Sequence, residues 1–296
     1  MTPDFEEIFN YALRSQLAYA IAQPAWYITE KLGWRTPSPY RIFIEEATHC
    51  EVNAIVELDD EQRVQWVAVR GSDNLSNWLA DFQYVEQPFT KHFAQQDLAL
   101  NLHCGFRQAA VEVLQTIEMH LERDYQTRIT GHSLGGAIAV ILMMFLTDEG
   151  YSIEKCITFG QPKVTNHIGA QQCHHLPLLR IINQEDSVPL VPPCTALNLL
   201  QGGYSHFGSE MQLEPDSYIY REAHNNCDLP SDSFWSRLFR IGVEEDIRQL
   251  SGNIENHYMK FYLLNLINKL HCGDSNLKNL LQGHSVAIQA VTALKR

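Results

Sequence analysis

A glycine-rich turn between two apolar segments constrains this chain more than any other feature of its sequence. Residues 131–136 read Gly-His-Ser-Leu-Gly-Gly, follow the short β-type segment 127–130, and lead into the apolar run 137–146. A strand, a tight turn and a buried helix in this order form one βα unit, and such units build a mainly parallel sheet. The apolar run is about half the length that spans a bilayer, so it predicts a buried helix.

The turn contains the pattern Gly-x-Ser-x-Gly, in which a serine stands at the tip of a strained strand-to-helix turn. Side chains two residues before and after the serine would collide with the neighbouring strand and helix, and Gly131 and Gly135 remove those side chains. The following helix points its N-terminus at an oxyanion, and the Leu134 N–H can donate to it. Ser133 is therefore the candidate nucleophile, and Leu134 a candidate oxyanion donor.

Apolar periodicity and turn signals predict the other elements of the fold. These are amphipathic helices at 5–21 and 105–123, a hairpin of strands at 51–58 and 63–69, and further strands at 156–159 and 178–183. No linker or repeat interrupts them. The expected organisation is a helical cover at 1–49, one α/β domain at 50–272, and a helical tail at 273–296.

Charge and cysteine usage exclude several classes of protein. The 296 residues include 22 Lys and Arg and 35 Asp and Glu, a net charge of −13 that repels nucleic acids and anionic lipid headgroups. The seven cysteines form no Cys-x-x-Cys pair, and Cys173 beside His174-His175 lacks a ligand geometry, so no metal or other cofactor is expected. The odd cysteine count favours a reducing compartment. Since residues 1–7 are not a signal peptide, we expect the protein to be cytoplasmic, or exported without a recognisable signal, with no transmembrane segment.

Six motifs occur in a fixed order along the chain. They are VAVRGSDNLSNWLADF at 67–82, LHCGF at 102–106, GHSLGG at 131–136, ITFGQPKVTN at 157–166, RIINQEDSVPLVPP at 180–193 and YSHFGSE at 204–210. In this order they resemble the class 3 lipases, the fungal-lipase-like branch of the α/β-hydrolases. The resemblance implies an α/β-hydrolase fold, with a mainly parallel central sheet, helices on both faces and a short helical lid.

A serine nucleophile needs a histidine to take its proton and a carboxylate to orient that histidine. In this fold the acid follows the serine in the chain, and the histidine comes last. Asp186 lies at the end of a predicted strand, ahead of the rigid Val188-Pro189 pair, and the resemblance places the family's acid there. Glu185 is the alternative acid.

The base is the least constrained member of the triad. His257 lies in Glu-Asn-His-Tyr just before the amphipathic stretch 258–270, and by resemblance the family's catalytic histidine precedes a similar aromatic-rich segment. We therefore expect His257 to be the base. His206 and His224 remain the alternatives, and the resemblance gives His206 a structural position near the sheet edge.

The segment after the strand at 63–69 is expected to supply a second oxyanion donor and a lid. By resemblance, Ser72 offers its backbone N–H and its hydroxyl to the oxyanion. Helical spacing predicts an amphipathic helix over 74–82, and in the family this position belongs to the mobile lid. A static helix packed on the core is the alternative. The apolar residues of the lid are Leu75, Trp78, Leu79 and Phe82.

The resemblance implies a serine hydrolase that cleaves carboxylic esters, most naturally a lipase for acylglycerols or phospholipid acyl esters. The expected partner is such an ester, met at a lipid–water interface through the lid. Two other functions stay open. One is a soluble esterase for small or aromatic esters, and the other is a non-catalytic lipase-like interaction module, which the three filled triad positions disfavour. The sequence predicts no oligomeric state.

Overall fold

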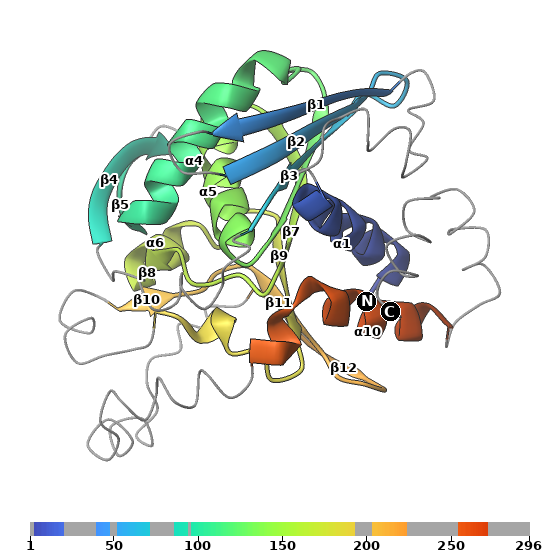
Figure 1. Ribbon diagram of the computed structural model, residues 1–296. Coiled ribbons are helices and arrows are strands. Elements are labelled where there is room, and N and C mark those ends of the chain that lie inside the picture. Colours follow the sequence, from blue (N-terminus) through green and yellow to red (C-terminus); the bar gives the residue numbers. More distant parts are fainter. Residues whose placement is uncertain are drawn as a thin grey trace, which may run out of the picture.

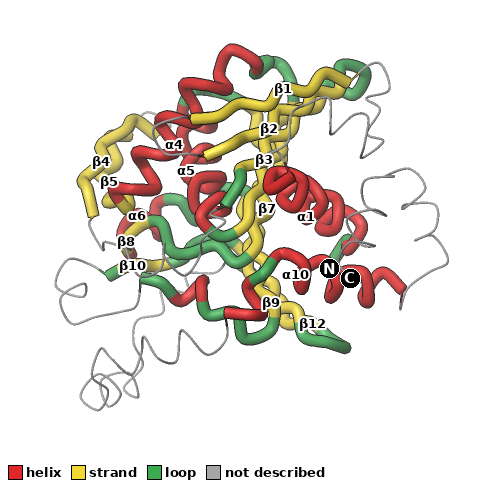
Figure 2. The backbone as a smooth tube through the Cα atoms, in the orientation of Figure 1, coloured by secondary structure: helices red, strands yellow, loops and turns green. Residues whose placement is uncertain are grey.

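A sheet of eight strands forms the central layer of the protein (Figure 2). The computed structural model describes residues 3–20, 40–47, 52–71, 86–93, 96–192, 203–223 and 254–271. In spatial order the strands are β1 (Tyr40–Ala47), β2 (Val52–Asp59), β3 (Val64–Val69), β6 (Gln126–His132), β7 (Ser152–Phe159), β9 (Leu178–Asn183), β11 (Ser209–Leu213) and β12 (Tyr218–Arg221). The five strands from β3 to β11 run parallel, and β1, β2 and β12 add antiparallel edges. The predicted mainly parallel sheet is confirmed.

Helices cover both faces of this sheet (Figure 1). One face carries α4 (Cys104–Ile117) and α5 (Leu134–Asp148), and the other carries α1 (Phe5–Ala20) and α10 (Met259–His271). Alternation along β3 shows how one strand serves both layers: Val67 and Val69 pack in the α4–α5 layer, whereas Val64 and Trp66 pack in the α1–α10 layer. The apolar run after Ser133 is the fully buried part of α5, as expected.

A second, smaller sheet lies beside α4 and was not expected from the sequence (Figure 1). Its strands, in spatial order, are β10 (Tyr204–Ser205), β8 (Thr165–Asn166), β5 (Gln96–His103) and β4 (Glu86–Phe93). Helix α6 (His167–Gln172) follows β8, and 3₁₀ turns occupy Glu118–His120, Val188–Leu190 and Ile254–His257. Among the described residues, no helix has the length and apolar character needed to cross a membrane.

Two expected boundaries were wrong. Residues 1–49 are not only a helical cover, because Tyr40–Ala47 forms edge strand β1, whose Ile44 pairs with Ile55 of β2. The α-helix expected over 105–123 ends at Ile117, and a 3₁₀ turn follows at Glu118–His120. The predicted tail at 273–296 lies outside the described residues.

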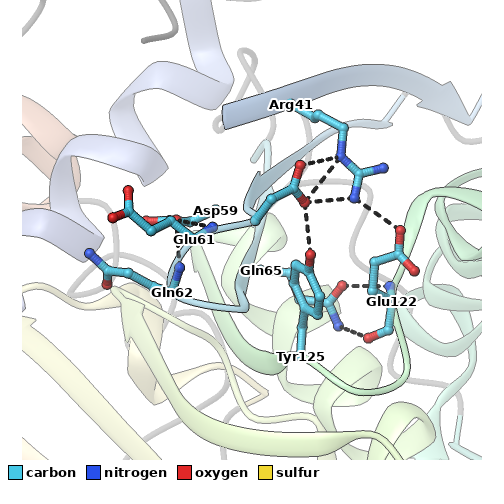
Figure 3. Close-up of polar contacts among 8 residues, drawn as sticks. Arg41, Asp59, Glu61, Gln62, Gln65, Glu122 and Tyr125 are labelled. Carbon is cyan, nitrogen blue, oxygen red and sulfur yellow. Dashed lines mark hydrogen bonds and ion pairs between the residues drawn. The ribbon is translucent and has the colours of Figure 1, made fainter. Parts of the chain in front are cut away.

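An exposed polar network joins β1 to the amino end of the parallel strands (Figure 3). Arg41 Nη2 donates to Asp60 Oδ1 at 2.7 Å, and Arg41 Nε donates to Asp60 Oδ2 at 2.9 Å. Arg41 Nη2 also donates to Glu122 at 3.0 Å. The Tyr125 hydroxyl also donates to Asp60, at 2.8 Å. Because Tyr125 precedes β6 and Ser133 follows it, this network lies at the opposite end of β6 from the candidate nucleophile.

Candidate active site

Ser133 occupies a strained turn between the central strand β6 and helix α5. Its backbone has φ 57° and ψ −129°, an unfavourable conformation for a residue with a side chain, and such strain costs on the order of 1–3 kcal/mol. The Ser133 N–H donates to the Phe159 carbonyl at 2.9 Å, and this bond ties the turn to the end of β7. The residue is only 1% exposed.

The glycines around Ser133 allow this turn to form. A Cβ on Gly131 would collide with the carbonyl group of Gly135, and a Cβ on Gly135 would collide with the backbone of Val69 and Arg70. Strand β6, helix α5 and the end of β3 therefore approach one another more closely than side chains would permit. Leu134 is the first residue of α5, so no preceding turn of the helix accepts its N–H.

Asp186 and His257 form a buried hydrogen-bonded pair. His257 Nδ1 lies 2.8 Å from Asp186 Oδ2, and the two residues are 1% and 5% exposed. Asp186 Oδ2 also accepts from the Tyr262 hydroxyl at 2.5 Å, and Oδ1 accepts from the Val188 N–H at 2.9 Å. Burial alone would raise the pKa of Asp186, but attraction to His257 and these hydrogen bonds hold it below the ordinary value. The carboxylate is therefore held in its charged form.

A glycine at the end of β7 lets this pair approach the sheet. Gly160 has φ 57°, and a Cβ there would lie 2.7 Å from Asp186 Oδ2 and 2.7 Å from His257 Cε1. The ends of β6, β7 and β9 thus meet the turn that carries His257. This is the carboxyl edge of the parallel strands, where open α/β sheets bind their ligands.

Two atoms of the predicted catalytic residues lack a hydrogen-bond partner among the described residues. Among the described residues, neither Ser133 Oγ nor His257 Nε2 has one, although both atoms are buried. A buried unpaired polar group is costly, and such groups are retained where chemistry needs them. Because His257 Nδ1 is bound to Asp186, its Nε2 is the nitrogen left to accept a proton.

The alternative acid and base have other surroundings. Glu185 is exposed, whereas Asp186 is buried against His257. His206 Nε2 donates to the Pro189 carbonyl at 2.7 Å, and burial together with Arg180 and Lys163 lowers the pKa of His206 well below its usual value. His206 thus fastens the loop that follows the acid.

Lys163 fastens the same loop from the end of β7. Its Nζ donates to the carbonyl oxygens of Leu190 and Pro192, at 2.9 and 3.1 Å, and its backbone N–H donates to Val191 at 2.8 Å. The loop after Asp186 is therefore held by hydrogen bonds from both Lys163 and His206.

Several predicted site residues lie outside the described residues. They are the oxyanion donor Ser72, the alternative base His224, and the lid residues Leu75, Trp78, Leu79 and Phe82. The described residues bring together no group of three or more His, Cys, Asp or Glu side chains that could hold a metal ion.

Sequence reasoning missed Tyr262, the third group bound to the carboxylate of Asp186. The available signal was a tyrosine in the apolar stretch after His257, since a buried phenol hydroxyl needs a polar partner. The sequence alone does not show which partner.

A Gly-x-Ser-x-Gly turn after a central parallel strand, with an Asp–His pair supplied by later loops, is the site architecture of the α/β-hydrolases, and the protein has that fold. Residues 66–196 match the family described as Lipase (class 3), which is the family that the sequence motifs resemble.

The curated relatives are lipases and phospholipases. The chain is 27% identical to a lipase of Rhizomucor miehei over 179 residues, which cover 56% of this chain and 46% of that protein. It is 25% identical to a chloroplastic phospholipase A1 of Arabidopsis thaliana over 184 residues, which cover 55% of this chain and 24% of that protein. The chain thus spans less than half the length of these relatives.

Solved structures show the same fold. Lipase II from Rhizopus niveus superimposes with a TM-score of 0.59 at 21% identity, covering 78% of this chain and 91% of that one. Rhizomucor miehei lipase in its propeptide complex gives a TM-score of 0.56 at 23% identity, covering 72% of this chain and 70% of that one. The predicted α/β-hydrolase fold is confirmed.

Proposed function

We propose that the protein is a serine hydrolase that cleaves carboxylic esters of lipids, either acylglycerols or phospholipids. The observation that carries this proposal concerns Ser133 Oγ and His257 Nε2, which are buried and have no hydrogen-bond partner among the described residues, while His257 Nδ1 lies 2.8 Å from Asp186 Oδ2. The lipid class of the substrate is supported by the relatives, which are a lipase and a phospholipase A1.

The first half of the reaction forms an acyl-enzyme. Ser133 Oγ attacks the ester carbonyl carbon while His257 Nε2 takes the hydroxyl proton. Asp186 keeps the His257 ring in the correct tautomer and stabilises the imidazolium that forms. The tetrahedral intermediate then collapses, the alcohol leaves with the proton from His257, and the acyl group stays on Ser133.

The second half releases the acid. A water molecule gives a proton to His257 Nε2 as its oxygen attacks the acyl-enzyme carbonyl, and collapse returns the proton to Ser133 Oγ. In both halves the oxyanion accepts from the Leu134 N–H at the start of α5, where the helix dipole also favours negative charge. Ser72 is the proposed second donor.

The test compares the wild type with Ser133→Ala on p-nitrophenyl esters of graded chain length. Ser152→Ala is the matched control, because Ser152 is an exposed serine at the start of β7. We expect Ser133→Ala to lower kcat/KM by at least about 10⁴-fold, and the control to match the wild type. Equal activity in the wild type and Ser133→Ala would overturn the mechanism, and a preference for acetyl over octanoyl esters would remove the lipid substrate.

The identity of the base has its own test. His257→Gln should lose at least about 10²-fold in kcat, the usual contribution of a general base. His206→Gln keeps an amide donor for the Pro189 carbonyl, so its kcat should stay much closer to that of the wild type. The reverse order of the two variants would move the base to His206.

We also propose that the helix predicted over 74–82 is a lid that meets lipid through its apolar side. Leu79→Ser should then reduce activity on emulsified lipid more than activity on a dissolved short ester. Ile168→Ser is the control, because Ile168 is an apolar residue of α6 that is 52% exposed. Since the net charge is −13, anionic lipid should not strengthen binding. Equal effects of the two variants would contradict the lid.

A reducing compartment remains part of the proposal. Cys104, Cys156 and Cys173 are free thiols, and burial raises the pKa of both Cys156 and Cys173, so these two thiols are unreactive. One relative, from Fusarium solani, is a secreted lipase. Titration of the denatured protein with a thiol reagent should find all seven cysteines reduced if the protein works in the cytoplasm.

A further inference from the structure

A chain of two hydrogen bonds reaches the backbone of His257 from helix α1. The Tyr19 hydroxyl lies 2.7 Å from His132 Nδ1, and His132 Nε2 lies 2.6 Å from the carbonyl oxygen of His257. His132 is the variable residue of the Gly-x-Ser-x-Gly turn and directly precedes Ser133. The mechanism above uses neither Tyr19 nor His132.

The direction of each bond follows from its chemistry. The carbonyl oxygen of His257 can only accept, so His132 Nε2 carries the proton and donates it. Burial raises the pKa of Tyr19, so the phenol keeps its proton and can donate to Nδ1 of a neutral His132. Burial, with the charge of His257, also lowers the pKa of His132 to about 3. The ring is therefore neutral at neutral pH, with its proton on Nε2.

The Tyr19 oxygen also contacts the backbone next to the predicted oxyanion donor. A Cβ on Gly71 would collide with the Tyr19 hydroxyl and with the carbonyl of His132. A hydrogen bond with the Gly71 backbone acts on the Tyr19 phenol as well. Gly71 precedes Ser72 in the chain, so one phenol oxygen touches both His132 and the start of the oxyanion segment.

We propose that Tyr19 and His132 are positioning residues, which fix the backbone of His257 and the turn at Gly71 relative to Ser133. This inference rests on the proposed function, because it concerns the same site. His257 belongs to a single 3₁₀ turn, Ile254–His257, and among the described residues its side chain hydrogen-bonds through Nδ1 alone. The bond from His132 to the His257 carbonyl supplies a second fixed point, and two points determine where Nε2 lies.

The neutral state of His132 suits this task. The ring centroids of His132 and His257 are 4.5 Å apart, and the Tyr262 ring also packs against His132, at 5.9 Å. His257 becomes an imidazolium during the proposed reaction, and Asp186 is hydrogen-bonded to its Nδ1. A lysine in place of His132 could also donate to the carbonyl, but its charge would oppose that imidazolium.

The test compares His132→Leu with His132→Gln. Leucine removes the donor, whereas glutamine keeps an amide N–H at a similar distance from the backbone. We expect His132→Leu to lower kcat by about 10- to 100-fold with little change in KM, the effect of a misplaced catalytic group. His132→Gln should recover most of that loss. Equal kcat values in the two variants, or a change in KM alone, would overturn the proposal.

Tyr19→Phe is a second variant in case His132→Leu does not fold. It removes one oxygen atom and leaves the ring, so kcat should fall by about 2- to 10-fold, as for one lost hydrogen bond. An unchanged kcat in this variant would remove Tyr19 from the proposal.

A readout without turnover separates this inference from the proposed function. The His257 Nδ1 proton, shared with Asp186, can be followed by NMR, and its exchange with solvent should be at least tenfold faster in His132→Leu than in His132→Gln or the wild type. If the wild type neither hydrolyses esters nor reacts with a fluorophosphonate at Ser133, the proposed function is wrong. In that case the exchange rates still test whether His132 positions His257. Equal exchange rates in all three proteins would refute it.

Discussion

The hydroxyl of Tyr262 offers a measurement of how strongly the buried carboxylate depends on its partners. Tyr262 lies on α10, is fully buried in the apolar layer that α1 and α10 form against the sheet, and donates to Asp186 Oδ2 at 2.5 Å. Tyr262→Phe deletes this one oxygen. The matched control is Tyr11→Phe, because Tyr11 is equally buried in the same layer but, among the described residues, its hydroxyl makes a single long hydrogen bond, 3.5 Å to the carbonyl of Lys155.

The expected losses of stability differ because the two hydroxyls donate to different acceptors, a carboxylate for Tyr262 and a backbone carbonyl for Tyr11. A hydrogen bond to a charged group contributes about 1.5–3 kcal/mol, whereas a long bond to a neutral carbonyl lies at or below the usual 0.5–1.5 kcal/mol. Tyr262→Phe should therefore lower the free energy of unfolding by about 2 kcal/mol, and Tyr11→Phe by less than about 1 kcal/mol. Urea denaturation at neutral pH, followed by circular dichroism, measures both values.

The pH dependence has a definite sign. The folded protein holds the pKa of Asp186 below 3.8, and the Tyr262 hydrogen bond is one cause. Stability from this carboxylate is therefore fully present above pH 3.8 and is lost as the pH falls through the lower, folded value. The stability gap between the wild type and Tyr262→Phe should narrow on acidification, and the Tyr11→Phe gap should not.

Equal losses in the two variants, or a Tyr262→Phe gap that is constant with pH, would refute this reasoning. The same variant should also lower kcat, because the carboxylate that orients His257 loses one of its partners. An unchanged kcat together with the expected loss of stability would limit Tyr262 to a structural role.

Three further outcomes are expected. Gly135→Ala should destabilise the fold by several kcal/mol, because the new Cβ would collide with the backbone at the end of β3. Gly150→Ala has no atom within 4 Å of the new Cβ, so it should cost only the strain of its positive φ, about 1 kcal/mol. Thermal melts compare the two variants, and equal melting temperatures would contradict the predicted collision at Gly135. The pKa of His132 falls from 6.5 to about 3 on folding, so its contribution to the free energy of unfolding is fully present above pH 6.5 and is lost as the pH falls toward 3, at about 1.4 kcal/mol per pH unit. His132→Gln should therefore make the free energy of unfolding less dependent on pH between 3 and 6.5. An unchanged pH dependence in this variant would count against a neutral His132 ring. Arg14→Met should lower the free energy of unfolding by about 3 kcal/mol, because it leaves the buried Glu57 carboxylate without its 2.8 Å partner. A loss below about 0.5 kcal/mol in urea denaturation would show that Glu57 is solvated instead.

The parts of the fold that depend on local pattern were predictable. Ser133 and its two glycines lie within five residues, and the constraint on that turn is steric, so the sequence states it directly. The two layers were predictable for a similar reason, since β3 alternates side chains between the two faces of the sheet. Strand β1 was missed because charged residues near its C-terminal end, Glu45 and Glu46, obscure the alternation of its apolar residues.

The polar contacts that complete the candidate site were not predictable. Tyr262 reaches Asp186 across 76 residues of sequence, and His132 is linked to Tyr19 and His257 across 113 and 125 residues. No spacing rule connects groups at such separations. Their positions follow from how α1 and α10 pack on the sheet, and that packing becomes visible only in three dimensions.

The pairing of α1 with α10 also has a consequence for synthesis of the chain. Buried residues of α1, such as Phe9 and Tyr11, share an apolar layer with Leu263 and Leu266 of α10, and the two helices lie against each other. About 240 residues separate them, so at 5–20 residues per second α1 leaves the ribosome roughly 12–50 seconds before its partner exists. During that interval its apolar face is exposed to chaperones and to other nascent chains.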